Sequence, residues 1–155
     1  MNAVKELFKI FKGTMDYGLW YPKYQNFTLR AFIAADWERS VDDRKSTSGA
    51  TFFLGNCLVS WLSKKQSSIS LSTAEAEYIV VASCCTQVIW IKRTLEDLLV
   101  KYEDPIVISC DNTSAINISR NPVMHSKTKH IPIKYHFLRD QVSENVVKLE
   151  YVNTK

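Results

Sequence analysis

A long apolar helix, predicted near the middle of the chain, is the feature that most constrains the fold. Hydroxyl residues at 70–73 can cap its start, and apolar residues then recur at helical spacing as far as Leu98. Before it, two apolar strands flank Gly55-Asn56, a pair that suits a hairpin turn. After it, Pro105 opens a short apolar strand that ends at Asp111. This order indicates a mixed α/β domain whose antiparallel strands come first.

The remaining elements follow from periodicity and from turn residues. The predicted order is a helix ending at Gly13, strands at 17–21, 27–34, 49–54 and 57–62, the long helix with a kink around 83–86, a strand at 106–110, helices at 113–119 and 133–142, and a strand at 146–152.

Composition limits the class of protein. With 155 residues, 46% of them hydrophobic, and only four Gly and four Pro, the chain suits one globular domain and excludes collagen, coiled coil and long disorder. No run approaches the roughly 20 apolar residues of a membrane span, so we expect no membrane partner. The four cysteines form no CxxC pair, so we expect free thiols, a reducing compartment and an intracellular location.

Positive charge is unevenly placed although the net charge is only +4. Between Asp111 and Asp140 there is no acidic residue. The basic residues and histidines of this stretch are Arg120, His125, Lys127, Lys129, His130, Lys134, His136 and Arg139. The stretch is either a surface that faces phosphates or a solvated helix face with its flanking loops.

Three acidic residues could carry chemistry. Asp111 directly follows a predicted strand, where open α/β sheets place their ligand sites, although it could equally cap the next helix. Glu75 and Glu77 lie two positions apart in the long helix, about 200° around its axis, so only one can face a given point. Both could instead simply favour the positive helix N-terminus.

Other catalytic templates are missing from the sequence. There is no glycine-rich phosphate loop, no HExxH and no GxSxG, and the three histidines are too irregularly spaced for a zinc site of their own. The acidic residues Asp36, Asp42 and Asp43 lie among basic residues, as is typical of a solvated loop.

Five motifs in a fixed order carry a family resemblance. They are DDRKSTSG at 42–49, SWLSKKQ at 60–66, STAEAEY at 72–78, CDNTSAI at 110–116 and NPVMHSKTKHI at 121–131. Together they closely resemble the RNase H domain of copia-type LTR-retrotransposon Pol polyproteins, particularly those of plants. Residues 1–26 resemble the connection from reverse transcriptase to RNase H, and 27–155 resemble the RNase H domain.

The resemblance implies an RNase H-like fold: a five-stranded mixed sheet, first three strands antiparallel, with helices on both faces. It also implies hydrolysis of the RNA strand of an RNA/DNA hybrid, using two Mg²⁺ (or Mn²⁺) ions held by four carboxylates. The implied partners are the hybrid and the reverse transcriptase domain of the same polyprotein. The implied location is the nucleus or a cytoplasmic virus-like particle.

The family's metal-binding carboxylates transfer only in part. The first Asp position is occupied by Ala34, and Asp36, two residues on, is a runner-up for that role. The second carboxylate matches Glu77, with Glu75 as its runner-up, and the third matches Asp111. These residues are therefore the predicted catalytic and metal-binding positions.

The fourth Asp of the family follows a Thr-Lys, and this sequence ends at Thr154-Lys155. With two of four carboxylates missing, we expect weak or single-ion binding and an inactive or strongly impaired nuclease.

Nucleic acid binding is a separate expectation. The candidate contacts are Lys64, Lys65, Asn112, Lys127, Lys129 and His130. The alternative function is a degenerate or domesticated copy that binds RNA/DNA hybrid or double-stranded RNA without cleaving it.

Overall fold

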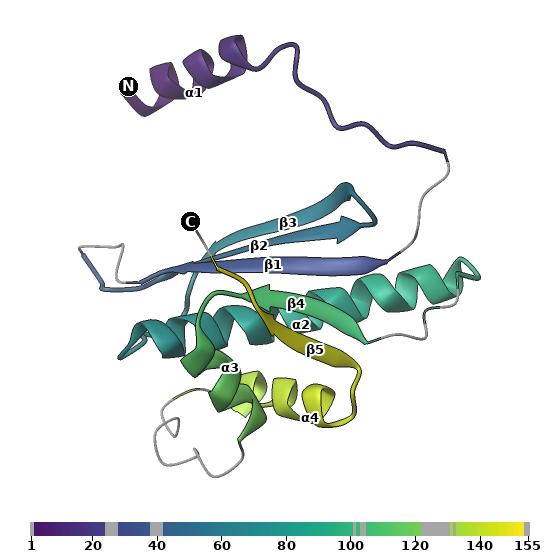
Figure 1. Cartoon of the computed structure of the whole chain (residues 1–155). Helices are drawn as coiled ribbons and strands as arrows, with labels where there is room; N and C mark the ends of the chain where they lie inside the picture. The colour runs from purple at the N-terminus through teal and green to yellow at the C-terminus, as the bar shows by residue number, and fades with distance from the viewer. Residues whose placement is uncertain are drawn as a thin grey trace.

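The computed structural model of the chain forms one five-stranded mixed sheet with helices packed against it (Figure 1). It describes residues 2–23, 28–37, 42–100, 102, 105–121, 131 and 133–153. The strands are β1 (Leu29–Asp36), β2 (Thr47–Leu54), β3 (Cys57–Lys65), β4 (Ile106–Cys110) and β5 (Val147–Tyr151).

The spatial order of the strands is β3-β2-β1-β4-β5. The pairs β1/β2 and β2/β3 are antiparallel, whereas β1/β4 and β4/β5 are parallel. The first three strands form an antiparallel meander, and crossover connections through helices add the last two. The predicted five-stranded mixed sheet, with its first three strands antiparallel, is confirmed.

The hairpin turn lies where the sequence predicts it. Gly55 adopts a φ of 61°, a conformation that glycine reaches without steric cost, and its N–H donates to Thr28 O at 2.8 Å. The predicted strand at 17–21, in contrast, is wrong. Residues 17–22 form no regular element, and Tyr17 and Trp20 are 82% and 83% exposed. Their aromatic character favours a strand, but no neighbouring strand pairs with them.

The long helix is α2 (Thr73–Asp97). It begins at a capping box, in which Ser72 Oγ accepts from Glu75 N and Glu75 Oε2 accepts from Leu71 N at 2.7 Å. The helix α2 runs unbroken through 83–86, where the sequence predicts a kink, and there the hydroxyls of Ser83 and Thr86 donate to the carbonyls of Ile79 and Ala82.

The helix α2 supplies most of the core. Its length and hydropathy would also suit a membrane span, but 67% of its most apolar window is buried against the rest of the fold. The largest fully buried side chains of the core are Tyr78, Phe52, Leu29, Ile79, Ile106, Ile108, Leu138 and Leu149.

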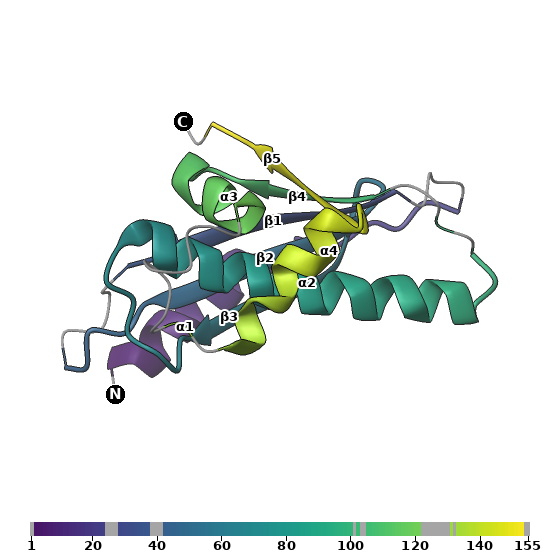
Figure 2. The same ribbon diagram turned by 90° about the horizontal axis from the view of Figure 1, so that it is seen from below.

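Two further helices and a 3₁₀ turn pack on the same face as α2 (Figure 2). They are α3 (Thr113–Arg120), η2 (Ile133–Tyr135) and α4 (Phe137–Ser143). The predicted helix at 133–142 is therefore divided into η2 and α4. The Tyr78 hydroxyl, which donates to Tyr135 O at 3.2 Å and lies 3.0 Å from His136 Nδ1, ties this junction to α2.

The resemblance implies helices on both faces of the sheet, but among the described residues no helix packs on the opposite face. Phe32 and Phe53 form an edge-to-face pair on it, with ring centroids 5.7 Å apart, and Phe32 is 41% exposed. The helix α1 (Asn2–Gly13) lies on this side in Figure 1 but apart from the strands. The linker after α1 contacts β3, because Tyr21 Oη donates to Leu58 O at 2.6 Å.

The four cysteines, Cys57, Cys84, Cys85 and Cys110, are free and buried, as the sequence predicts.

Candidate functional site

A cluster of three side chains lies at the carboxyl ends of β1 and β4. Glu77 reaches it from the second turn of α2, Cys110 is the last residue of β4, and Asp111 follows directly. One potential ligand atom from each residue lies within 4.8 Å of the other two. Two residues predicted from the sequence, Glu77 and Asp111, are thus brought together, and Cys110 joins them.

Only one of the two carboxylate oxygens of Glu77 has a hydrogen-bond partner among the described residues. Its Oε1 accepts a 2.8 Å hydrogen bond from the backbone N–H of Ala35, whereas Oε2 is buried and has no hydrogen-bond partner among the described residues. The residue is 6% exposed. The pKa of Glu77 is raised from 4.5 to about 7. Burial is the main cause, and the charge of Asp111 adds to it, while the hydrogen bond from Ala35 partly offsets both.

Glu75 has a different role. Its Oε2 accepts from Leu71 N in the capping box, so its carboxylate faces the loop before α2. It is not one of the three clustered residues. The helical spacing predicts that only one of Glu75 and Glu77 can face the site, and that residue is Glu77.

Ala34 precedes Ala35, whose backbone N–H bonds to Glu77, so the backbone at position 34 lies next to this cluster. Phe32 pairs with Ser109, and advancing two residues along each parallel strand leads to Ala34 and Asp111. Ala34 is exposed and offers no ligand atom. Asp36, the runner-up for this position, is exposed at the very end of β1 and lies outside the cluster of described residues.

Cys110 is a site residue that the sequence did not predict. Strand alternation turns its side chain toward α2, where its sulfur lies 3.4 Å from the backbone N of Asn112. Burial raises the pKa of Cys110 to about 11; the Asn112 hydrogen bond lowers it, while the charges of Glu77 and Asp111 raise it. Its position directly before Asp111, at the end of a buried strand, was the available signal.

The donor set can be compared with the ions that the resemblance implies. Two Mg²⁺ ions held by four carboxylates need more oxygen ligands than the described cluster supplies, since it offers two carboxylates and a thiol. The cluster therefore does not fit a pair of Mg²⁺ ions. One hydrated Mg²⁺ would find two carboxylates, Glu77 and Asp111, which is a common number for this ion.

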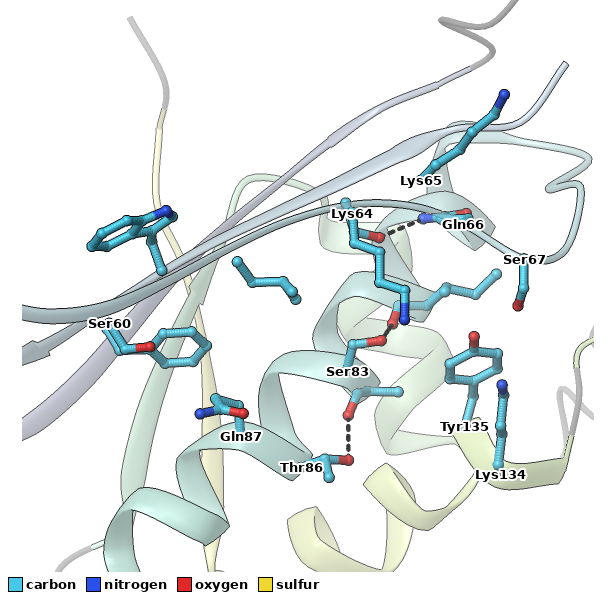
Figure 3. Close-up of a pocket in the computed structure, with 16 residues that line it drawn as sticks. Ser60, Lys64, Lys65, Gln66, Ser67, Ser83, Thr86, Gln87, Lys134 and Tyr135 are labelled. Atoms are coloured by element: carbon cyan, nitrogen blue, oxygen red, sulfur yellow. Dashed lines mark hydrogen bonds between the residues drawn. The ribbon is translucent and has the colours of Figure 1, made fainter.

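A pocket of about 520 Å³ lies between β3, α2 and η2 (Figure 3). Lys64 reaches down into it toward Ser83, and Lys134 and Tyr135 enter from the opposite wall. The other polar side chains that line it are Ser48, Ser60, Lys65, Gln66, Ser67, Ser83, Thr86 and Gln87. No carboxylate is among the described lining residues, so the pocket favours an anionic ligand.

The amide of Gln66 holds the walls of this pocket together. Its Nε2 donates to Ser48 Oγ and to Ala76 O, both at 3.0 Å, and its Oε1 accepts from Ser70 Oγ at 3.0 Å. Gln66 is 5% exposed, so these three bonds satisfy an amide that would otherwise be buried without partners.

The predicted nucleic-acid contacts are placed unequally. Lys64 and Lys65 line the pocket, although Lys65 Nζ also pairs with Asp43 Oδ1 at 2.8 Å. The side chain of Asn112 caps α3, accepting from Ser114 N and Ala115 N. Lys134 belongs to the basic stretch but was not singled out from the sequence.

The other three predicted contacts, Lys127, Lys129 and His130, lie outside the described residues.

The chain has close relatives among plant retrotransposon polyproteins. It is 39% identical over 153 residues to a retrovirus-related Pol polyprotein from transposon RE2 of Arabidopsis thaliana, covering 99% of the chain and 10% of that polyprotein. The Pol polyprotein from transposon RE1 of the same plant is 38% identical over 154 residues, with the same two coverages. A third, from transposon TNT 1-94 of Nicotiana tabacum, is 35% identical over 99% of the chain and 11% of the polyprotein.

The chain thus spans about a tenth of the length of the curated relatives it matches. No protein-family model matches it.

Solved structures with a related arrangement have low sequence identity to the chain. The N-terminal RNase H domain of a Mycobacterium tuberculosis protein is 10% identical, with a TM-score of 0.48 over 81% of this chain and 83% of that one. The protease-reverse transcriptase of prototype foamy virus is 11% identical, with a TM-score of 0.48 over 88% of this chain and 19% of that one.

Proposed function

We propose that the chain is the RNase H-like part of a plant copia-type retrotransposon Pol polyprotein, and that it binds RNA/DNA hybrids and cleaves them poorly or not at all. Its 35–39% identity to three plant Pol polyproteins supports the family. The observation that carries the proposal is the alanine at position 34, directly before Ala35, whose backbone N–H donates to Glu77 Oε1. The position where the family has its first metal-binding Asp is an alanine next to the two carboxylates that are present.

The absence of a carboxylate at position 34 should lower the rate of cleavage. A carboxylate that holds metal against the reacting phosphate contributes several kcal/mol at the transition state, and each 1.36 kcal/mol changes the rate about tenfold. The loss of one such ligand therefore lowers cleavage by orders of magnitude. Glu77 and Asp111 remain available for a single hydrated ion, which would leave binding of metal without efficient hydrolysis.

The pocket between β3, α2 and η2 is the proposed contact for the hybrid. Lys64 and Lys134 supply positive charge, and hydroxyl and amide groups supply hydrogen bonds to phosphate and sugar oxygens. Double-stranded RNA is the competing ligand, because its A-form backbone presents the same groups.

Residues 1–26 are proposed as the connection to the reverse transcriptase domain of the same polyprotein. In α1, Phe8 and Phe11 are 67% and 58% exposed, so the helix presents an apolar surface that the sheet does not cover.

A gel assay with labelled RNA/DNA hybrid in Mg²⁺ and then Mn²⁺ tests this function, reading band shift and cleavage together. Double-stranded RNA and double-stranded DNA serve as competitors. We expect a shifted hybrid band without cleavage. Cleavage at the rate of an intact RNase H domain would contradict the impaired activity, no shift at low salt would contradict hybrid binding, and preferential competition by double-stranded RNA would favour the alternative ligand.

A further inference from the structure

We propose that Glu77, Cys110 and Asp111 form a binding site for a thiophilic divalent cation such as Zn²⁺ or Cd²⁺, with the Cys110 sulfur as a direct ligand. This inference deepens the proposed function, since it concerns the cluster that the proposed function leaves with too few carboxylates for paired Mg²⁺ ions. It does not depend on binding of nucleic acid.

The geometry is close to that of a bound ion. In a tetrahedral zinc site, metal–ligand distances of about 2.0–2.3 Å place the ligand atoms about 3.3–3.8 Å from one another. The three ligand atoms here lie within 4.8 Å of one another, so shifts of about 1 Å would close the site. Glu77 and Cys110 are anchored on α2 and β4, the two elements that meet in the core, which limits how far the site can spread.

An orphaned oxygen points to a missing ligand. Glu77 Oε2 is buried without a hydrogen-bond partner among the described residues, and Glu77 as a whole is only 6% exposed. Buried polar atoms of this kind nearly always have a partner. A cation held between Glu77, Cys110 and Asp111 would provide that partner.

The donor chemistry selects the kind of ion. Mg²⁺ takes oxygen ligands almost exclusively, whereas a thiolate favours Zn²⁺ and other soft or borderline ions. Two carboxylates and one thiolate carry three negative charges, enough to offset a divalent cation. Three protein ligands would leave a fourth tetrahedral position for water.

Binding of the cation exchanges a proton for a metal ion and involves no redox change. The S–H bond of Cys110 breaks, a metal–sulfur bond forms, and the proton passes to solvent. Both carboxylates bind through oxygen, and the charge of the metal ion stays at two.

Titration of the metal-free protein with Cd²⁺ and with Co²⁺, in the absence of nucleic acid, tests the site. Thiolate coordination gives a sulfur-to-metal charge-transfer absorption, and we expect it to saturate at one ion per chain. We expect Cys110→Ser to abolish this absorption and Cys57→Ser, a buried cysteine on β3, to retain it. Excess Mg²⁺ should not displace the bound ion.

No charge-transfer absorption, or one that survives Cys110→Ser, would overturn the proposal. If Cys110→Ser does not fold, Glu77→Gln tests the site in its place. Glu96→Gln is its control, since Glu96 is an exposed carboxylate at the far end of the same helix. Glu77→Gln should weaken Cd²⁺ binding at least about tenfold and Glu96→Gln should not; equal affinities would overturn the proposal.

These results are independent of the gel assay. A protein that binds Cd²⁺ through Cys110 but does not shift hybrid would uphold the site and contradict the proposed function. A protein that shifts hybrid but gives no charge-transfer absorption would support the proposed function and contradict the metal site.

Discussion

The backbone N–H of Ala35 donates a 2.8 Å hydrogen bond to Glu77 Oε1, joining the end of β1 to the second turn of α2. This contact holds the Glu77 carboxylate beside Asp111 and Cys110, while its second oxygen stays buried without a described hydrogen-bond partner. Ala34, the position that the resemblance assigns to a further carboxylate, is the residue directly before Ala35. The chemistry of the site therefore depends on a buried acid held by backbone.

Glu77 should make stability depend on pH. Its pKa is raised from 4.5 to about 7, mainly by burial, so the folded state holds a proton that the unfolded state releases. The free energy of unfolding should therefore fall as pH rises from about 4.5 to about 7 and then level off. The size is at most about 3 kcal/mol, less where water screens the carboxylate.

Urea unfolding at about pH 5 and about pH 8 in the presence of a chelator checks this prediction. Glu77→Gln should remove most of the difference between the two pH values. Glu96→Gln, on the exposed end of the same helix, should leave it as in the unchanged protein. A pH difference that is the same in both variants would mean that another group is responsible.

Gln66 should be one of the most sensitive polar positions in the fold. Gln66→Met keeps the volume of the side chain but removes its three hydrogen bonds to Ser48, Ala76 and Ser70. We expect a loss of about 2–4 kcal/mol in the free energy of unfolding, because the partners stay buried. Gln87→Met, which changes a half-buried amide in the same pocket, should cost less than about 0.5 kcal/mol. Similar losses in both variants would argue against the role of the network.

Much of the fold could be predicted from local signals. The strand 106–110 and the Gly55-Asn56 hairpin were correctly placed, because a proline and a turn pair mark their limits. The 17–21 segment was not, because its aromatic residues match a strand locally while its backbone lacks a partner. Pairing is a long-range property that composition does not encode.

The site could be predicted only in part. Helical spacing showed that one of Glu75 and Glu77 faces a given point, but the choice between them needed the Ala35 contact and the capping bond to Leu71. Cys110 and the orphaned oxygen of Glu77 were not predictable, since both depend on how α2 packs against the end of β4. The Lys134 contribution to the pocket likewise depends on where η2 docks.

Tyr78 should couple the stability of the core to the pocket. Tyr78→Phe removes the hydroxyl that contacts Tyr135 O and His136 Nδ1, at a cost of about 1–2 kcal/mol. Because Tyr135 and Lys134 form one wall of the pocket, hybrid affinity should fall as well. Thermal unfolding and gel-shift titration measure the two effects. Tyr17→Phe, on a side chain that is 82% exposed, should change neither stability nor affinity. If Tyr78→Phe lowers stability but leaves hybrid affinity unchanged, then Tyr78 contributes to the core and not to the pocket.

Lys64 and Lys134 should each contribute to the salt dependence of hybrid affinity. Removing one phosphate contact lowers the slope of log affinity against log salt by about one unit, so Lys64→Ala with Lys134→Ala should lower it by about two. Lys148→Ala is the control, since Lys148 lies on β5 and pairs with Glu150 at 2.7 Å. An unchanged slope in the double variant would mean that Lys64 and Lys134 are solvent-exposed and do not contact phosphates of the hybrid.

Ala34→Asp should restore a carboxylate to the vacant position and change both metal binding and activity. The new side chain would lie beside Asp111 at the strand ends and near Glu77, so three negative charges would repel one another without an ion. We expect the metal-free variant to be less stable than the unchanged protein at neutral pH. Mg²⁺ should recover that stability, and a gain of 1 kcal/mol would raise the melting temperature by about 2–4 °C.

Ala34→Asn separates charge from size, because it adds a side chain of the same shape without a negative charge. Ala34→Asp should cleave hybrid in Mg²⁺ at least about tenfold faster than the unchanged protein, a gain of 1.36 kcal/mol or more at the transition state, and Ala34→Asn should not. Stabilisation by Mg²⁺ without cleavage would show that the position binds metal but that one added carboxylate does not complete the catalytic site. Equal behaviour of the two variants would mean that position 34 does not face the ion, and the register argument that pairs it with Asp111 would then be wrong.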